Sequence, residues 1–160
     1  MPSSTSPTSG AAEPGSLSAD AVDGLQQALA AEHAAVWSYG LAAAFLGSAS
    51  QAAAAEGSSV HQGRAEANER WIKGAGATPR AAEPAYVPPE QVTNATTAAA
   101  MLATVESDVC VAWRGVLERT DDAALRGIAL AALTDAAVRA TRWRVTAGQT
   151  PATPAFPGKP

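Results

Sequence analysis

The stretch LQQALAAEHAAVWSYGLAAAFL, residues 25–46, decides the fold of this 160-residue chain. Its seam residues recur at intervals that alternate between four and three, which places them on one face of an α-helix. They are Leu25, Leu29, Glu32, Val36, Tyr39, Ala43 and Leu46. We therefore expect a long helix that packs against other helices along this face.

Alanine carries most of the 47% hydrophobic content, and glycine and proline gather outside the alanine-rich stretches. Alanine is the strongest helix former, so this clustering separates helices from linkers. We predict helices over residues 18–46, 50–73, 94–119 and 121–147. The expected N-caps are Ser18, Thr93 or Asn94, and Thr120 or Asp121, and Gly47 is expected to stop the first helix.

The lengths of the connections predict the topology. Only a few residues join the first helix to the second and the third to the fourth, so each pair should form an antiparallel hairpin. The proline-rich linker 75–92 lies between the hairpins, and extended chain of this length reaches about 60 Å at roughly 3.3 Å per residue. A helix of 25 residues is only about 37 Å long. The sequence thus predicts an all-α, antiparallel four-helix bundle of ferritin-like architecture, with a long crossover between helices two and three.

The predicted bundle domain covers residues 18–148. Residues 1–17 are expected to be disordered, and the proline-rich residues 149–160 are expected to form a C-terminal tail.

Composition excludes several classes of function. The net charge is −4 and no Lys/Arg cluster resembles a nucleic-acid footprint, so no nucleic-acid partner is expected. The single cysteine excludes an internal disulfide and a zinc site built on several thiolates. The longest apolar stretch, 34–46, is too short to cross a bilayer, and residues 1–16 lack the pattern of a signal peptide. We expect a cytoplasmic protein without a membrane partner, which self-associates as a homodimer through a surface poor in charge.

Each predicted helix carries one polar side chain that we expect to point inward. Glu32 and Glu106 lie within apolar seams, His61 lies on the second helix and Asp135 on the fourth. An isolated buried charge is costly, so a carboxylate on such a seam must be partnered, protonated or metal-bound. The four side chains form our candidate buried polar layer.

Two interpretations of this layer stay open. A di-metal carboxylate bundle uses Glu-x-x-His on two helices, and no such motif occurs in the chain. Arg64 and Arg139 lie near the candidate carboxylates and would neutralise them, which favours a buried ionic network in a non-catalytic bundle with no cofactor. The alternative is a divergent di-iron or di-manganese carboxylate oxidoreductase, or a metal-handling protein, with iron or manganese on the same residues. A third class is a small-ligand pocket lined by Trp37 and Trp113.

A weak internal echo links the two predicted hairpins. Glu32 is followed seven residues later by Tyr39, and Glu106 is followed seven residues later by Trp113. The echo favours two related hairpins.

The run AAEHAAVWSYGLA, residues 30–42, resembles the first-helix signature of an actinobacterial family of ferritin-like proteins that is catalogued as a domain of unknown function. The similarity continues through HQGR (61–64), GATP (76–79), PAYVP (84–88) and LTDAAVR (133–139). It covers about residues 18–148. This resemblance implies the ferritin-like fold and brings no established activity.

Overall fold

The structure is a computed structural model that describes residues 17–88 and 90–159. This part of the chain contains four helices and no strand, which confirms the predicted all-α class. The helices are α1 (Ala19–Ala43), α2 (Ser48–Gly74), α3 (Ala95–Arg119) and α4 (Ala123–Thr146). Of the segment expected to be disordered, only Leu17 lies within the described residues.

Side-chain caps fix three of the helix starts. Ser18 Oγ accepts a hydrogen bond from the Ala21 amide at 3.1 Å, and Asn94 forms a capping box with Thr97. The cap of α4 is Asp122, which accepts from the Leu125 amide at 2.8 Å, so the expected cap at Thr120 or Asp121 was wrong.

The first helix also ends earlier than predicted. α1 stops at Ala43, and Gly47 is the N-cap of α2 instead of the residue that terminates α1.

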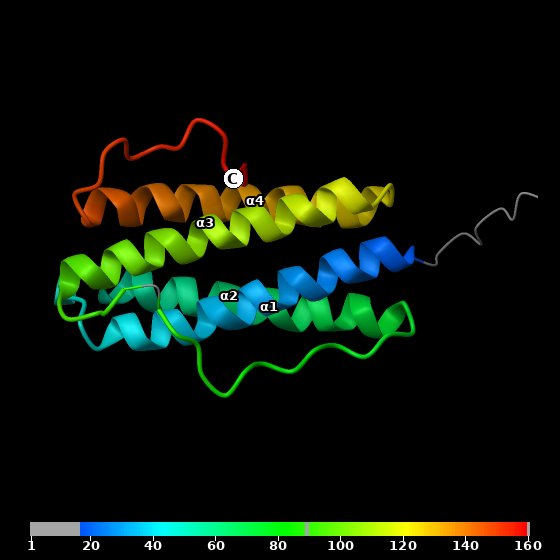
Figure 1. Ribbon diagram of the computed structural model, residues 1–160, viewed down its shortest axis with the longest axis horizontal. Coiled ribbons are helices and arrows are strands. Elements are labelled where there is room, and N and C mark those ends of the chain that lie inside the picture. Colours follow the sequence, from blue (N-terminus) through cyan, green and yellow to red (C-terminus); the bar gives the residue numbers. More distant parts are fainter. Residues whose placement is uncertain (1–16, 89, 160) are drawn as a thin grey trace, which may run out of the picture.

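The four helices pack as two antiparallel hairpins laid against each other. Figure 1 shows α1 beside α2 and α3 beside α4, with the long connection running the length of the bundle. Close packing joins α3 with α4, α1 with α3, and α1 with α2. The fourth side of the bundle is looser, because α2 and α4 approach one another much less closely than these pairs.

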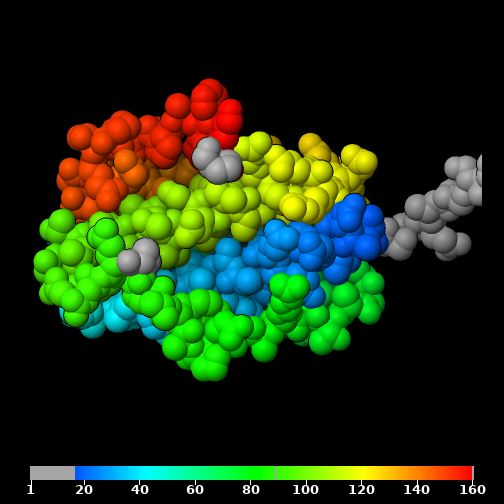
Figure 2. All heavy atoms as spheres, in the orientation of Figure 1, coloured from blue at the N-terminus to red at the C-terminus, as the bar shows by residue number. Residues whose placement is uncertain are grey.

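Gln26 fastens the crossover to α1. Its amide Nε2 donates to the Thr78 carbonyl at 2.8 Å, and its Oε1 accepts from the Arg80 amide at 2.9 Å. Farther along, the Trp37 and Tyr86 rings meet with their centroids 5.9 Å apart. The crossover, drawn in green, therefore covers the lower part of the face seen in Figure 2.

The C-terminal segment after α4 folds back over the second hairpin and, in its described part, contains no helix. Arg144 Nε donates to the Pro151 carbonyl at 3.0 Å. Gly158 is buried against α3, where an added Cβ would stand 2.8 Å from the Cys110 carbonyl oxygen. Glycine is thus the residue that lets this segment lie on the α3 backbone.

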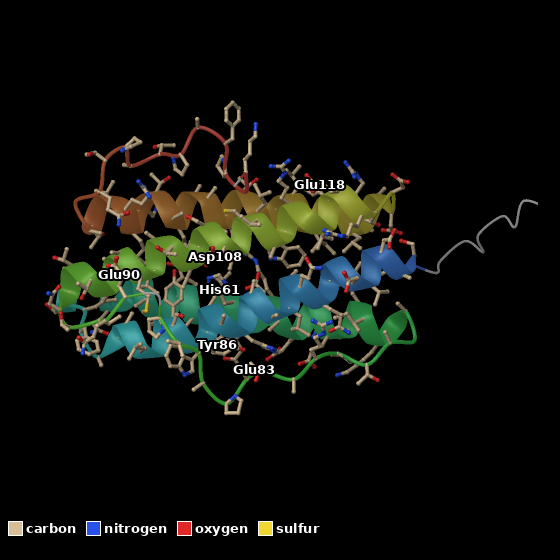
Figure 3. The ribbon with its side chains drawn as sticks, viewed as in Figure 1. His61, Glu83, Tyr86, Glu90, Asp108 and Glu118 are labelled. Carbon is tan, nitrogen blue, oxygen red and sulfur yellow. The ribbon has the colours of Figure 1, made fainter. Side chains whose placement is uncertain are left out.

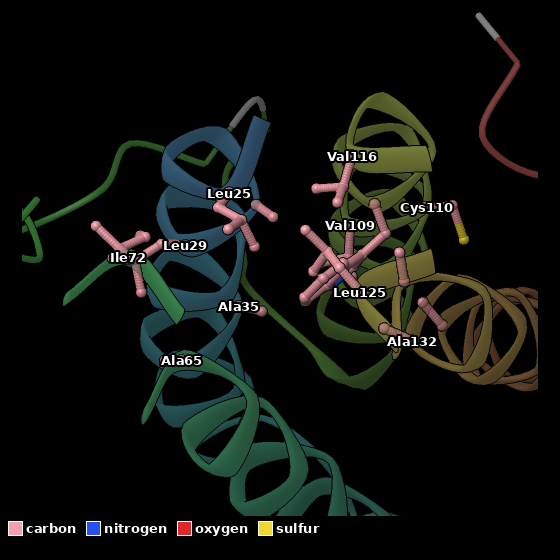
Figure 4. Close-up of a cluster of buried hydrophobic side chains, with 14 residues drawn as sticks. Leu25, Leu29, Ala35, Ala65, Ile72, Val109, Cys110, Val116, Leu125 and Ala132 are labelled. Carbon is pink, nitrogen blue, oxygen red and sulfur yellow. The ribbon is translucent and has the colours of Figure 1, made fainter. Parts of the chain in front are cut away.

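The apolar core is divided into two clusters. One surrounds Leu25 and Val116, which face each other between α1 and α3 in Figure 4. The other surrounds Leu102 and Trp143. On α3, Glu106 lies between the residues of the two clusters, and His61 does so on α2, so a polar layer falls where the clusters meet.

In the described part of the chain, α3 alone is long and apolar enough to cross a membrane by length and composition. Its mean hydropathy over 18 residues is only 1.2, and it packs between α1 and α4 as a core helix. Core helices of soluble proteins pass the same test, so α3 is weak evidence for a membrane span.

Gly57 allows α2 to approach the buried Tyr39 ring. A Cβ built on Gly57 would lie 2.3 Å from Tyr39 Cε1, well inside van der Waals contact. The ring is 1% exposed and touches His61 and Trp143, so it has no free space into which to move.

We expect Gly57→Ala to lower the free energy of unfolding by about 1–3 kcal/mol, because the methyl group overpacks the Tyr39 site. Gly63→Ala on the same helix is the matched control, since an added Cβ there meets nothing within 4 Å. The control should raise stability by roughly 0.5–1 kcal/mol through helix propensity. Urea unfolding of both variants measures the difference, and two stabilised variants would contradict the close approach.

Candidate functional site

A histidine held between two glutamates lies at the centre of the bundle. His61 from α2 places Nδ1 2.6 Å from Glu32 Oε2 on α1 and Nε2 3.0 Å from Glu106 Oε1 on α3. All three side chains are fully buried. Figure 3 shows His61 between the helices, in the middle of the bundle. The structure therefore brings together three of the four side chains of the candidate layer.

The charge state of His61 follows from its partners. Burial opposes the charged form, but hydrogen bonds to Glu106 and Glu32 and their charges outweigh burial and raise the pKa above its ordinary value. Only the imidazolium form donates from both ring nitrogens, and both nitrogens face carboxylate oxygens. The buried imidazolium thus acts as the cation between two acids.

Two aromatic side chains supply reciprocal hydrogen bonds across the hairpins. Trp113 Nε1 on α3 donates to Glu32 Oε1 on α1 at 2.5 Å. In return, Tyr39 Oη on α1 donates to Glu106 Oε1 on α3 at 2.5 Å. Each glutamate therefore receives its aromatic donor from the helix that carries the other glutamate. The two donors are the residues of the seven-residue echo in the sequence.

Tyr39 is held as a neutral donor. Burial, followed by the charge of Glu106 and the hydrogen bond to it, raises the pKa of the phenol far above its usual range. Trp143 Nε1 on α4 donates to Tyr39 Oη at 2.8 Å. α4 thus joins the network through the Trp143 indole, which was not among the predicted site residues.

Arg139 provides a second positive charge. Its Nε lies 3.2 Å from Glu106 Oε1, an ion-pair distance, although the geometry is not that of a hydrogen bond. Its guanidinium Nη2 also reaches Asp135 Oδ2 at 3.4 Å. The described network therefore sets an imidazolium and a guanidinium against two buried carboxylates.

Asp135 does not belong to the buried layer. Its side chain is 59% exposed and pairs with Arg64 Nη2 at 2.7 Å, so the expectation that it points inward was wrong. Arg64, expected to neutralise the buried acids, neutralises this surface carboxylate instead. The other expected partner, Arg139, does lie beside a buried acid.

Among the described residues, one carboxylate oxygen of the layer lacks a hydrogen-bond partner. Glu106 Oε2 is buried and has no hydrogen-bond partner among the described residues. Glu106 Oε1, by contrast, faces Tyr39, His61 and Arg139 together. The network is therefore complete around Glu32 and incomplete on one side of Glu106.

The donor set fits a metal ion poorly. Both nitrogens of His61 point at carboxylates and none is free to ligate. The indole of Trp113 occupies a further carboxylate oxygen, Glu32 Oε1, and the phenol of Tyr39 shares Glu106 Oε1 with His61. Among residues 17–88 and 90–159, no group of three or more His, Cys, Asp or Glu side chains has the geometry to hold a metal ion.

Most of the chain, from α1 onward, is similar to known proteins. A family model described as Domain of unknown function (DUF4439) matches residues 24–160, from within α1 through the other three helices, the crossover and the C-terminal segment. The crystal structure of a conserved hypothetical protein, rv2844, from Mycobacterium tuberculosis is similar, with 33% sequence identity and a TM-score of 0.77. That match covers 80% of this chain and 98% of the other. No curated protein matches the chain. Since the family model spans most of its length, this chain is a member of the DUF4439 family.

Proposed function

We propose that this protein is a non-catalytic bundle of the ferritin-like class, in which an ionic network occupies the layer where di-metal members hold their metals. The observation that carries the proposal is His61, which binds both Glu32 and Glu106 through its two ring nitrogens. An imidazolium at this place supplies the positive charge that a metal would otherwise supply between the acids.

The network specifies how the helices face each other. Buried ion pairs often add little net stability, because desolvation offsets their attraction. Removal of one partner is costly, since it leaves an uncompensated buried charge. Rotation of α1 or α3 about its axis would separate Glu32 or Glu106 from His61. The native arrangement of the helices is therefore favoured over arrangements in which either helix is rotated.

A non-catalytic ionic layer should leave the protein low in metal. We expect protein purified from cultures supplemented with iron and manganese to contain well below one metal ion per chain by mass spectrometry, because cationic and neutral donors already occupy the layer. Chelator treatment should leave the melting temperature unchanged.

The matched variant for this measurement is the double substitution Glu32→Ala/Glu106→Ala. Stoichiometric metal in the parent protein that disappears from the variant would refute the non-catalytic assignment.

One observation favours the alternative, a divergent metal-binding protein of the di-iron or di-manganese carboxylate type. Glu106 Oε2 is buried without a hydrogen-bond partner among the described residues, and such an oxygen suits a cation. In this alternative the metal would displace the proton of His61 Nε2, so metal binding would release protons. The metal analysis above separates the two candidates.

The stability of the fold should depend on pH through His61. Folding raises the pKa of His61, so its proton stabilises the folded state, fully below about 6.5 and progressively less as pH rises through the folded pKa. We expect the free energy of unfolding to fall between about pH 6.5 and 8 by up to about 1.4 kcal/mol per pH unit. Burial raises the pKa of Cys110 to about 12, so this thiol adds to the fall only near pH 8, where the unfolded thiol begins to ionise.

Urea unfolding across this window tests the slope. His61→Gln should remove the slope between about pH 6.5 and 7.5, below the range in which the unfolded Cys110 thiol ionises, whereas His33→Gln, at the only other histidine, should retain it. A slope that persists in His61→Gln would show that another group is responsible.

We also propose that the protein forms a homodimer in the cytoplasm through the outer face of α4. This face, opposite the core, exposes Leu130, Val138 and Val145, of which Val145 is 63% exposed. A reducing compartment suits the one cysteine, Cys110, which is a buried free thiol.

Light scattering after gel filtration should give the mass of a dimer for the parent protein. Val138→Asp/Val145→Asp should give a monomer, because the added charges would be buried at the interface. Val87→Asp is the matched control, since Val87 is 94% exposed on the crossover and should leave the dimer intact. Equal masses for the parent and the double variant would rule out this face.

A further inference from the structure

The loosely packed side of the bundle, between α2 and α4, contains two adjoining cavities. The inner cavity has a volume of about 210 Å³ and reaches the Trp113 ring, while the outer cavity has about 540 Å³ and extends toward Leu17. Ala67, Trp71 and Ile128 line both, so the two form one continuous site. We call this site the α2/α4 groove.

The inner end of the groove carries polar groups without partners. Asn68 is 1% exposed and lines the inner cavity, and neither its Oδ1 nor its Nδ2 has a hydrogen-bond partner among the described residues. Arg64 lines the same cavity, and its Nη1 is also buried without a partner in this part of the chain. Buried polar groups are nearly always hydrogen-bonded, so we expect a water molecule or a ligand to bind these atoms.

The remaining walls are apolar. Trp113 uses its only donor, Nε1, on Glu32, so it presents carbon atoms to the cavity. Ala132 and Ile128 from α4 complete this surface opposite Trp71. An inner cavity of about 210 Å³ has the room of several water molecules, at roughly 30 Å³ each, but offers them few hydrogen-bonding partners.

We propose that the α2/α4 groove binds a small amphipathic carboxylate. Its carboxylate accepts hydrogen bonds from Arg64 Nη1 and Asn68 Nδ2, and its hydrocarbon chain lies against Trp71 and Ile128 toward the outer cavity. Asn68 Oδ1 is left to accept from a water or a ligand hydroxyl.

Charge favours an anion at this site. Arg64 and Arg70 both line the groove, one at the inner cavity and the other at the outer cavity. Asp135 contacts Arg64 through Nη2 and also contacts Arg139. Nη1 of Arg64 has no partner among the described residues and is available to a ligand.

The groove differs from the ligand pocket that the sequence suggested. Trp113 does line it, but Trp37 packs against Tyr86 of the crossover, and the second indole is Trp71. Because Trp71 and Trp113 both line the inner cavity, tryptophan fluorescence reports on its occupancy. The proposal does not depend on the metal content of the ionic layer.

Titration of the full chain with decanoate, followed by tryptophan fluorescence and by calorimetry, tests the proposal. 1-Decanol serves as a probe of the same chain length with a neutral head. We expect saturable binding of decanoate, at least about tenfold tighter than 1-decanol, because only the carboxylate pairs with Arg64 as an anion.

Two variants locate the site. Asn68→Leu should weaken decanoate about tenfold or more without weakening 1-decanol, because it removes a polar partner and keeps an apolar side chain. Ala132→Leu, which fills part of the inner cavity, should weaken both probes. Gln62→Leu, at an exposed position of α2, is the matched control and should change neither affinity.

The following results would overturn the proposal: no saturable binding of decanoate to the parent protein, equal affinity for the alcohol, or unchanged decanoate affinity in both Asn68→Leu and Ala132→Leu. Absence of binding together with a higher melting temperature of Asn68→Leu would show that the groove holds water only. If Asn68→Leu fails to fold by circular dichroism, the contrast between the two probes and the Ala132→Leu variant still decides the outcome.

Discussion

The constraint on which the bundle depends is the buried His61 imidazolium that two acids share. Glu32 and Glu106 lie on helices that pack directly against each other, and two buried carboxylates that face one histidine would repel without a cation between them. His61 reaches this place from α2 and contacts both. The position of α2 relative to the α1/α3 pair is therefore fixed by chemistry as well as by packing.

The ionic layer also explains why the apolar core is split. The clusters around Leu25 and Leu102 each contain residues from both hairpins, and on α2 and α3 they lie on opposite sides of His61 and Glu106. Alanine side chains are small, so a cluster rich in alanine does little to fix the position of one helix along the axis of another. Directional hydrogen bonds from Trp113 and Tyr39 supply that definition, since a shift of one helical turn would break both.

Sequence periodicity predicted the parts of this structure where large and small side chains alternate. On α1 and α3 the bulky residues mark one face, so the inward direction of Glu32 and Glu106 followed from spacing. On α4 the buried face is mostly alanine, as at Ala129 and Ala136, while Val138 is exposed. Hydrophobic size therefore does not mark the inward face of this helix, and it gave no warning that Asp135 points outward. Gln26 could not be foreseen, because its partners are backbone groups of a linker without a regular pattern.

The exchange of aromatic donors has a consequence for assembly. Within the ionic layer each hairpin contributes one anion and one cation, Glu32 with His61 and Glu106 with Arg139, so the layer charges of each half balance. Neither half can satisfy its own glutamate, because the indole and phenol donors come from the opposite half. Halves that dock out of alignment would bury a carboxylate without its donor, so docking is favourable only when both halves meet in matching alignment. The hydrogen bonds across the hairpins therefore discriminate against incorrect pairing, which an apolar interface of alanines alone would not do.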